Sequence, residues 1–170
     1  MRSLLAMFRT EPRTARALYD AVVARARMPA WYREGGVADT LDGRFAALAT
    51  LLALVDLRLE RGQDAARQTS VSLAECFIED MDGELRQIGI GDPVMGKKVG
   101  SLVGSLGGRV GAWRRVLDGE ESWEAVIARS LHREQPVIPA AAAFAERELR
   151  AFWTGLAAQD DASLIAGKLP

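Results

Sequence analysis

The most regular hydrophobic pattern in the chain lies between residues 41 and 59. Its apolar side chains recur at alternating intervals of four and three residues, which is the spacing of one face of an α-helix. They are Leu41, Phe45, Leu48, Leu52, Val55 and Leu59. Asp39 or Thr40 can cap the start of this helix. Leu51 and Leu54 widen the apolar face, so the pattern predicts a helix at the centre of the core.

Five further segments repeat apolar residues with the period of a helix, and no segment alternates with the period of a strand. They are the stretch from Thr10 or Glu11 to the Met28-Pro29 break, and residues 65–88, 96–117, 122–131 and 140–156. Because the connections are short, neighbouring helices are expected to be mostly antiparallel. The sequence therefore predicts an all-α fold, a single-domain bundle of about six helices over residues 1–170. Loose segments are expected at 1–10 and 159–170.

Two consecutive predicted helices carry opposite charge. Between residues 75 and 92, six acidic residues accompany one base. Residues 97–115 then carry Lys97, Lys98, Arg109, Arg114 and Arg115, and no acid. Since a short break containing Gly89, Gly91 and Pro93 joins the two helices, we expect them to lie side by side.

The basic helix contains six glycines within its apolar repeat: Gly96, Gly100, Gly104, Gly107, Gly108 and Gly111. Each glycine inside a helix costs about 0.5–1 kcal/mol relative to alanine. At 100° per residue the glycines share one flank of the apolar stripe. A flank without side chains lets another backbone approach closely. We interpret it as close packing inside the molecule, with an interface to a partner as the alternative.

A near-match to a phosphate-binding loop spans residues 91–98. The pattern is G-x-x-x-x-G-K-[ST], but Lys98 stands where the magnesium-binding hydroxyl belongs, and a helix rather than a strand precedes it. Nucleotide hydrolysis is therefore not predicted. What remains is a candidate anion site at Lys97 and Lys98, because the N-terminus of a helix attracts anions.

Other residues are candidates for contact with a protein client. Trp31 and Tyr32 fall in a connector, where aromatic residues usually close the edge of a core but can also form an interaction site. The acids at 79–82 do not share one helix face and have no histidine beside them, which argues against a metal site. We favour an acidic surface that contacts the basic residues of a partner. The candidate client contacts are Trp31, Tyr32, Glu79, Asp80, Asp82, Gly100, Gly104 and Gly108. No catalytic residue, metal or cofactor is predicted.

The composition is that of an ordinary globular domain, with 170 residues of which 49% are hydrophobic and 26% charged. The net charge of −1 argues against a nucleic-acid partner. The single Cys76 allows no internal disulfide, and the lone His132 has no second histidine for a usual catalytic site. No apolar run reaches the roughly 20 residues of a membrane span. The apolar stretch at 4–8 is too short for a signal peptide. We therefore expect a cytoplasmic protein.

The sequence resembles the ubiquinol–cytochrome c chaperone family. The residues that carry the resemblance are FIEDMDGELRQIGIGD at 77–92, GKKVG at 96–100 and GGR at 107–109, with Trp31-Tyr32 and ADTLDGRF at 38–45 upstream. The resemblance covers roughly residues 15–155 and rests on a long ordered string rather than on one short motif. Without the long N-terminal extension of the mitochondrial members, the chain is similar to the shorter bacterial form.

This resemblance implies an all-helical, non-enzymatic assembly chaperone. Its expected client is newly made cytochrome b, or another membrane subunit of ubiquinol–cytochrome c reductase, the respiratory complex III. A small helper protein is a further candidate partner, and peripheral contact at the cytoplasmic face of the inner membrane is compatible with the role. The residues alone leave a second function open, a helical module that binds a small ligand, an anion or a lipid headgroup.

Overall fold

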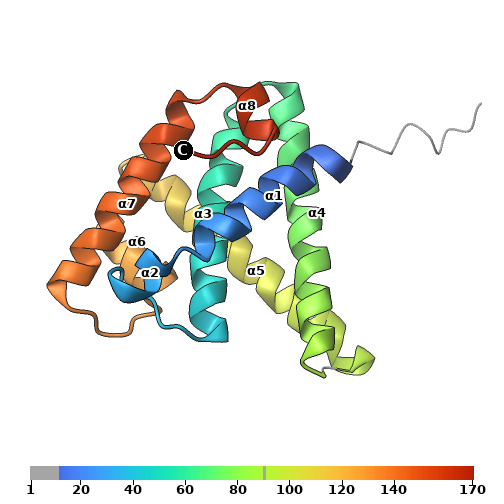
Figure 1. The fold of residues 1–170 in the computed structure, drawn as a ribbon, viewed down its shortest axis with the longest axis horizontal. Helices are drawn as coiled ribbons and strands as arrows, with labels where there is room; N and C mark the ends of the chain where they lie inside the picture. The colour runs from blue at the N-terminus through green and yellow to red at the C-terminus, as the bar shows by residue number, and fades with distance from the viewer. Residues whose placement is uncertain (1–11, 90) are drawn as a thin grey trace, which may run out of the picture.

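The computed structural model describes residues 12–89 and 91–170, and this part of the chain forms eight α-helices (Figure 1). They are α1 (Pro12–Ala26), α2 (Pro29–Arg33), α3 (Leu41–Glu60), α4 (Asp64–Gln87), α5 (Asp92–Leu117), α6 (Trp123–Ser130), α7 (Pro139–Ala158) and α8 (Asp161–Ile165). No strand occurs among the described residues, so the all-α class is confirmed. The predicted caps Thr10 and Glu11, and the segment 1–10 expected to be loose, lie outside them.

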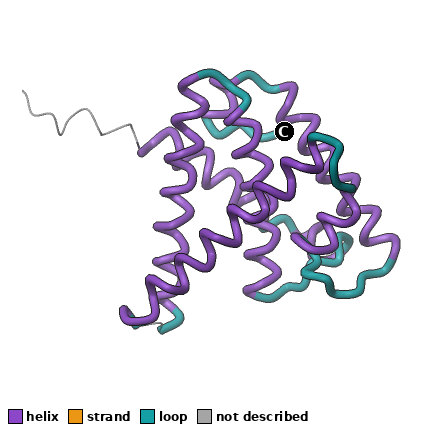
Figure 2. Tube along the Cα trace, turned by 180° about the vertical axis from the view of Figure 1, so that it is seen from behind, coloured by secondary structure: helices purple, strands orange, loops and turns teal. Residues whose placement is uncertain are grey.

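Helix α3 lies at the centre of the bundle. Thr40 caps its start, because its Oγ1 accepts a hydrogen bond from Gly43 N at 3.1 Å. Helices α1, α4, α5 and α7 pack against α3. Figures 1 and 2, taken from opposite sides, show α1 crossing one side of α3 and α5 the other. Every residue from 46 to 55 is buried, which explains why apolar positions on this helix extend beyond a single stripe.

The acidic and basic helices pack against each other, as their charges predicted. They are α4 and α5, and the turn between them contains Gly89 with φ of +84°, a left-handed conformation that favours glycine. On α4, Asp82 and Arg86 form an ion pair with an N–O distance of 2.8 Å. Both of these side chains are well exposed, so the pair contributes little to stability.

The expectation of a loose segment at 159–170 is wrong. The segment contains α8, and Leu164 within it is fully buried. The Gln159 side chain donates a hydrogen bond to Lys168 O at 2.7 Å. Gly167, with φ of +83°, lies so close to α1 that an added Cβ would be 2.8 Å from a backbone carbonyl of that helix. The segment therefore closes one end of the bundle.

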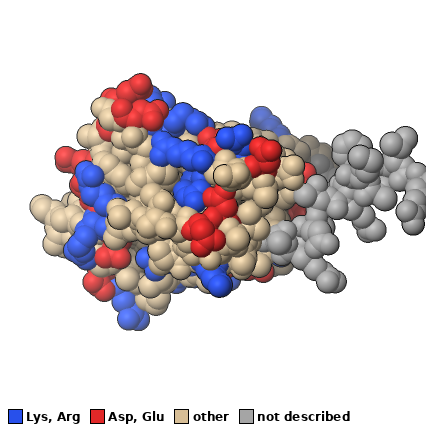
Figure 3. All heavy atoms as spheres, turned by 90° about the horizontal axis from the view of Figure 1, so that it is seen from above, with Lys and Arg blue, Asp and Glu red and all other residues tan. Residues whose placement is uncertain are grey.

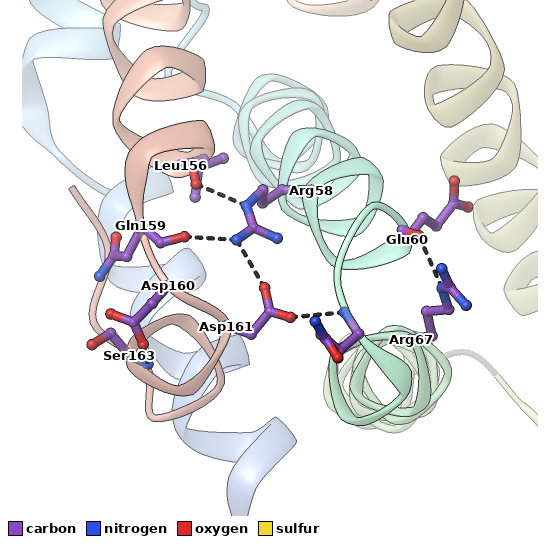
Figure 4. A network of polar contacts seen from close by, with 9 residues as sticks. Arg58, Glu60, Arg67, Leu156, Gln159, Asp160, Asp161 and Ser163 are labelled. Carbon is purple, nitrogen blue, oxygen red and sulfur yellow. Dashed lines mark hydrogen bonds and ion pairs between the residues drawn. The ribbon is translucent and has the colours of Figure 1, made fainter.

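Arg58 of α3 ties α7 and α8 to the centre of the bundle (Figure 4). Its guanidinium donates to the carbonyl oxygens of Leu156 and Gln159 at 3.0 and 2.6 Å, and to Asp161 Oδ1 at 2.8 Å. Asp161 Oδ2 accepts a further hydrogen bond from Gln63 N, at the start of α4. Seen from above in Figure 3, this end of the molecule carries basic and acidic side chains close together.

Asp56, also on α3, allows a test of a charge held inside the bundle. Ser70 donates a hydrogen bond to it, but burial outweighs this bond and raises the pKa of the Asp56 carboxyl. A raised pKa means that the ionised carboxylate costs stability, and that this cost appears as the pH rises through the folded-state pKa. Asp56→Asn keeps the acceptor without the charge. We expect it to raise the free energy of unfolding at pH 7 by up to about 1 kcal/mol, with a smaller gain near pH 4. Urea titration at both pH values checks this, and equal or lower stability at pH 7 would contradict it.

Candidate functional site

A groove opens between the start of α3 and the end of α4, where these two helices diverge in Figure 1. This α3–α4 groove has a volume of about 530 Å³, and side chains of α1, α2 and α5 complete its walls. The helix lengths explain the opening. Helix α1 has 15 residues, whereas α3 has 20 and α4 has 24. At 1.5 Å per residue α1 spans about 22 Å, so it covers only part of the seam between its two neighbours.

Apolar side chains line both long walls of the α3–α4 groove. Leu41, Phe45 and Leu48 come from α3, Met81 and Leu85 come from α4, and Ile88 caps the end of α4. Both sets follow the i, i+4, i+7 spacing, so each forms one stripe along its helix. Leu41 is 62% exposed and Ile88 is 56% exposed, although the sequence pattern placed both in the core. That prediction is wrong at the mouth of the groove, because α1 does not reach the ends of the two stripes.

Charged residues of both signs stand around this groove. They are Arg27, Asp42, Arg44, Asp80, Glu84 and Lys98. Helix α4 contributes only acids, α3 contributes one charge of each sign, and the remaining two, Arg27 directly after α1 and Lys98 on α5, are bases. Tyr19 donates a hydrogen bond from its hydroxyl to Asp80 Oδ2 at 2.8 Å, and burial, followed by this acid, raises the pKa of the Tyr19 hydroxyl. The Asp80 carboxylate is thereby held at the groove wall.

The two aromatic residues predicted in a connector lie in the short helix α2, and they differ in exposure. Trp31 is 4% exposed, donates from Nε1 to Arg25 O at 3.0 Å, and meets the Phe144 ring edge-on. It is a core residue and presents little surface to a client in this structure. Tyr32 is half-buried, donates from its hydroxyl to Ala26 O at 2.8 Å, and lines the α3–α4 groove.

Most of the glycines of α5 face open space, so the interpretation of close packing inside the molecule is wrong. At Gly96, Gly100, Gly104, Gly107 and Gly108 an added Cβ would meet nothing within 4 Å beyond the local helix. All five are exposed, while Leu102, Leu106 and Trp113 on the same helix pack into the core. We call the open side the glycine face and define it by Gly100, Gly104 and Gly108, which recur every fourth residue.

Gly104→Ala tests whether the glycine face is open. With nothing near the added methyl group, the variant gains the helix propensity of alanine, and we expect its free energy of unfolding to rise by about 0.5–1 kcal/mol. Gly43→Ala in α3 is the matched control, because its Cβ would collide with the carbonyl oxygen of Ala38. That control should lose stability in the same urea titration. A loss in Gly104→Ala would mean that another part of the molecule covers this face.

The three candidate acids of α4 do not lie on one surface, as their spacing predicted. Asp80 lines the α3–α4 groove, whereas Glu79 and Asp82 do not. Glu79 is exposed, and Asp82 forms the ion pair with Arg86. Two separate surfaces of α4 therefore carry these charges.

The structure also separates the two lysines of the candidate anion site. Lys98 lines the α3–α4 groove, and Lys97 does not. Helix α5 begins at Asp92, so both lysines lie in its second turn rather than at its N-terminal amides. The segment 91–98 is thus the first part of a helix and not a phosphate-binding loop.

The remaining reactive side chains have structural surroundings. Cys76 is buried, and burial raises the pKa of its thiol. His132 is buried rather than at the surface, and its Nε2 is 2.8 Å from Gly35 O. Among residues 12–89 and 91–170, no three acidic, histidine or cysteine side chains are placed to hold a metal ion. No helix in this part of the chain is long and apolar enough to cross a membrane.

The sequence did not identify most of the residues that line the α3–α4 groove as candidate contacts. Those missed include Leu41, Arg44, Glu84, Leu85 and Ile88. One signal could have found them. The apolar stripes of the second and third predicted helices run to positions that a shorter first helix cannot cover. Uncovered ends of such stripes point to a groove, although the sequence does not show which ends meet.

An all-helical fold with an open groove and an open glycine face fits the class of proteins that bind other proteins. A family profile described as ubiquinol–cytochrome C chaperone matches residues 33–169. The chain therefore belongs to the ubiquinol–cytochrome c chaperone family, which confirms the resemblance drawn from its motifs. This membership gives it the role of an assembly chaperone for ubiquinol–cytochrome c reductase, complex III.

A solved structure supports the same relationship. The chain is similar to the crystal structure of the Cbp3 homolog from Brucella abortus, with a TM-score of 0.75 and 27% sequence identity. The similarity covers 98% of this chain and 95% of that one. A comparison with curated proteins finds no match.

Proposed function

We propose that this chain is a non-enzymatic chaperone that binds newly made cytochrome b, or another membrane subunit, during assembly of ubiquinol–cytochrome c reductase. Family membership over residues 33–169 supports the reductase as the complex that is assembled. The observation that carries the binding role is the open glycine face of α5.

The glycine face is costly for the isolated chain. Each of its glycines weakens α5 by about 0.5–1 kcal/mol relative to alanine. No contact within the described structure offsets this cost at Gly100, Gly104 or Gly108. Helices of membrane proteins associate through small residues that let their backbones approach closely. A spanning helix of the client could therefore pack on this face before it is assembled.

Acidic residues of α4 supply a second kind of contact in this proposal. Glu79 and Asp82 are charged groups outside the α3–α4 groove, while Asp80 and Tyr32 line it. Cytoplasmic loops of membrane proteins carry an excess of lysine and arginine, which these acids would attract. The chaperone would then act in the cytoplasm or peripherally at the cytoplasmic face of the inner membrane, with or without a small helper protein.

Deletion of the gene is the direct test. We expect the level of assembled reductase to fall, measured as ubiquinol–cytochrome c reductase activity and as complex on native gels. Other respiratory complexes should persist, and a plasmid copy of the gene should restore the reductase. In a pull-down from cells, tagged protein should retain cytochrome b. Normal reductase in the deletion strain would refute the chaperone role, and retention of another membrane subunit in place of cytochrome b would make that subunit the client.

A further inference from the structure

We propose that the α3–α4 groove receives an amphipathic α-helix of a protein partner, with an apolar stripe facing into the groove and charged flanks of both signs. This proposal goes beyond the chaperone role, because it concerns a different surface from the glycine face. It rests on the shape of the groove, its apolar walls and the charges around it.

The walls have the spacing that an inserted helix requires. Leu41, Phe45 and Leu48 on α3 face the groove, as do Met81 and Leu85 on α4 and Ile88 at its C-cap. A helix placed between two such stripes can interlock with both if its own apolar residues recur at i, i+4 and i+7. Helices α3 and α4 already diverge at this end, so the groove accepts a stripe of side chains without separating them further (Figure 1).

The charges around the groove decide which kind of helix fits. Six charged residues line a groove of about 530 Å³. Asp42, Asp80 and Arg44 already have partners in the protein. A helix that is apolar on all sides, as a membrane span is, would nevertheless remove Arg27, Glu84 and Lys98 from water without offering them partners, which is costly. An amphipathic helix places its apolar stripe in the groove and its polar flanks beside the charges. The groove therefore favours a water-compatible helix over a spanning one.

The distribution of charge gives the flanks of that helix. Asp80 and Glu84 make the α4 side acidic, whereas Arg27, directly after α1, and Lys98 on α5 are basic. On α3 the groove carries one charge of each sign, and both already have a partner: Arg44 pairs with Asp39 and Asp42 pairs with Arg133. A helix with bases along one flank and acids along the other complements both sides at once. A helix with flanks of one sign would be attracted on one side and repelled on the other.

Designed peptides test the proposal on the intact protein. The probe is a fluorescein-labelled helical peptide of about 18 residues, with leucines at i, i+4, i+7 and i+11, lysines along one flank and glutamates along the other. Two further peptides carry only lysine or only glutamate flanks, and a fourth has the same composition with its leucines spread around the helix. Fluorescence anisotropy should show the mixed-flank peptide binding at least tenfold more tightly than the other three. Equal binding of the fourth peptide, or no binding of the first, would overturn the proposal.

Matched variants show where on the protein the peptide binds. The double variant Leu41→Ser/Ile88→Ser removes two exposed aliphatic side chains from the mouth of the groove. It should weaken binding tenfold or more. Val71→Ser with Ile138→Ser is the control, because these side chains are 64% and 69% exposed but lie outside the groove. The control should bind as the wild type does, and equal weakening in both double variants would overturn the site. Glu84→Lys should weaken the mixed-flank peptide and strengthen the peptide with only glutamate flanks.

The same peptides and variants distinguish two other possible occupants of the α3–α4 groove. If a second copy of this chain fills the groove, sedimentation will show a dimer that dissociates in the Leu41→Ser/Ile88→Ser variant, and the proposal fails. If an uncharged polyleucine–alanine helix in detergent binds more tightly than the mixed-flank peptide, the charge argument fails. Reductase levels play no part in these measurements, so the proposal and the chaperone role stand or fall separately.

Discussion

Replacing Arg58 with alanine is expected to lower the free energy of unfolding by about 2–3 kcal/mol, because a partly buried charge loses its hydrogen bonds to three acceptors. The Arg58 side chain is 12% exposed, and the Asp161 side chain is 23% exposed. The arginine also donates to the carbonyl oxygens of Leu156 and Gln159 (Figure 4). Alanine would leave the carboxylate and both carbonyls without this donor. Thermal and urea unfolding give the measurement.

Two variants separate the geometry of this contact from its charge. Arg58→Lys keeps the charge but cannot reach three acceptors with a planar fork, so it should lose part of the stability. Arg44→Ala is the control, because its ion pair with Asp39 is 62% exposed on both sides and should change stability by less than about 1 kcal/mol. A loss in Arg58→Ala no larger than that in Arg44→Ala would contradict the role given to Arg58.

The pH dependence of the same variant follows from Asp161. Its pKa is lowered by the backbone N–H of Gln63 and by Arg58. A group with a lowered pKa contributes stability above its ordinary pKa, and this contribution is lost as the pH falls through the folded-state pKa. The difference between wild type and Arg58→Ala should therefore be largest near neutral pH and narrow below about pH 4.

The periodic helices could be predicted from the sequence because their apolar residues repeat every three to four positions. The stripe at 41–59 predicted α3, and Thr40 was correctly identified as a candidate cap. The opposite charges of the acidic and basic helices also predicted that α4 and α5 pack together. In each case the signal lies within a short stretch of chain, where local geometry decides the outcome.

The short helices could not be predicted in the same way. Helices α2 and α8 have five residues each, too few to show a period. Trp31 therefore looked like part of a connector, and the last segment looked loose. Their positions depend on distant residues, such as Phe144 beside Trp31 and Arg58 beside Asp161.

The open surfaces could not be predicted because periodicity identifies an apolar face but not what covers it. Leu41 and Ile88 continue buried stripes, yet both are exposed because α1 ends before reaching them. A glycine flank likewise fits close packing and open solvent equally well. The structure distinguishes the two at Gly104, where no neighbouring atom lies near an added Cβ.

Long polar side chains on the glycine face should abolish reductase assembly while leaving the chaperone more stable. The variant carries glutamine at Gly100, Gly104 and Gly108, where added atoms meet open space. Glutamine favours helix over glycine by several tenths of a kcal/mol per position, so the purified protein should unfold at higher urea concentration. The same side chains would keep a client backbone from approaching α5. Expressed in the deletion strain, the variant should leave the reductase near the level of the deletion.

A triple alanine variant at these three positions separates stability from contact. Alanine also stabilises α5, but it is small enough for two helices to pack closely. It should therefore restore most of the reductase, although it is at least as stable as the glutamine variant. Because stability rises in both variants, a loss of assembly only with glutamine cannot come from misfolding. Full assembly with glutamine would show that the client does not contact the glycine face and would shift the search to Glu79 and Asp82 on α4.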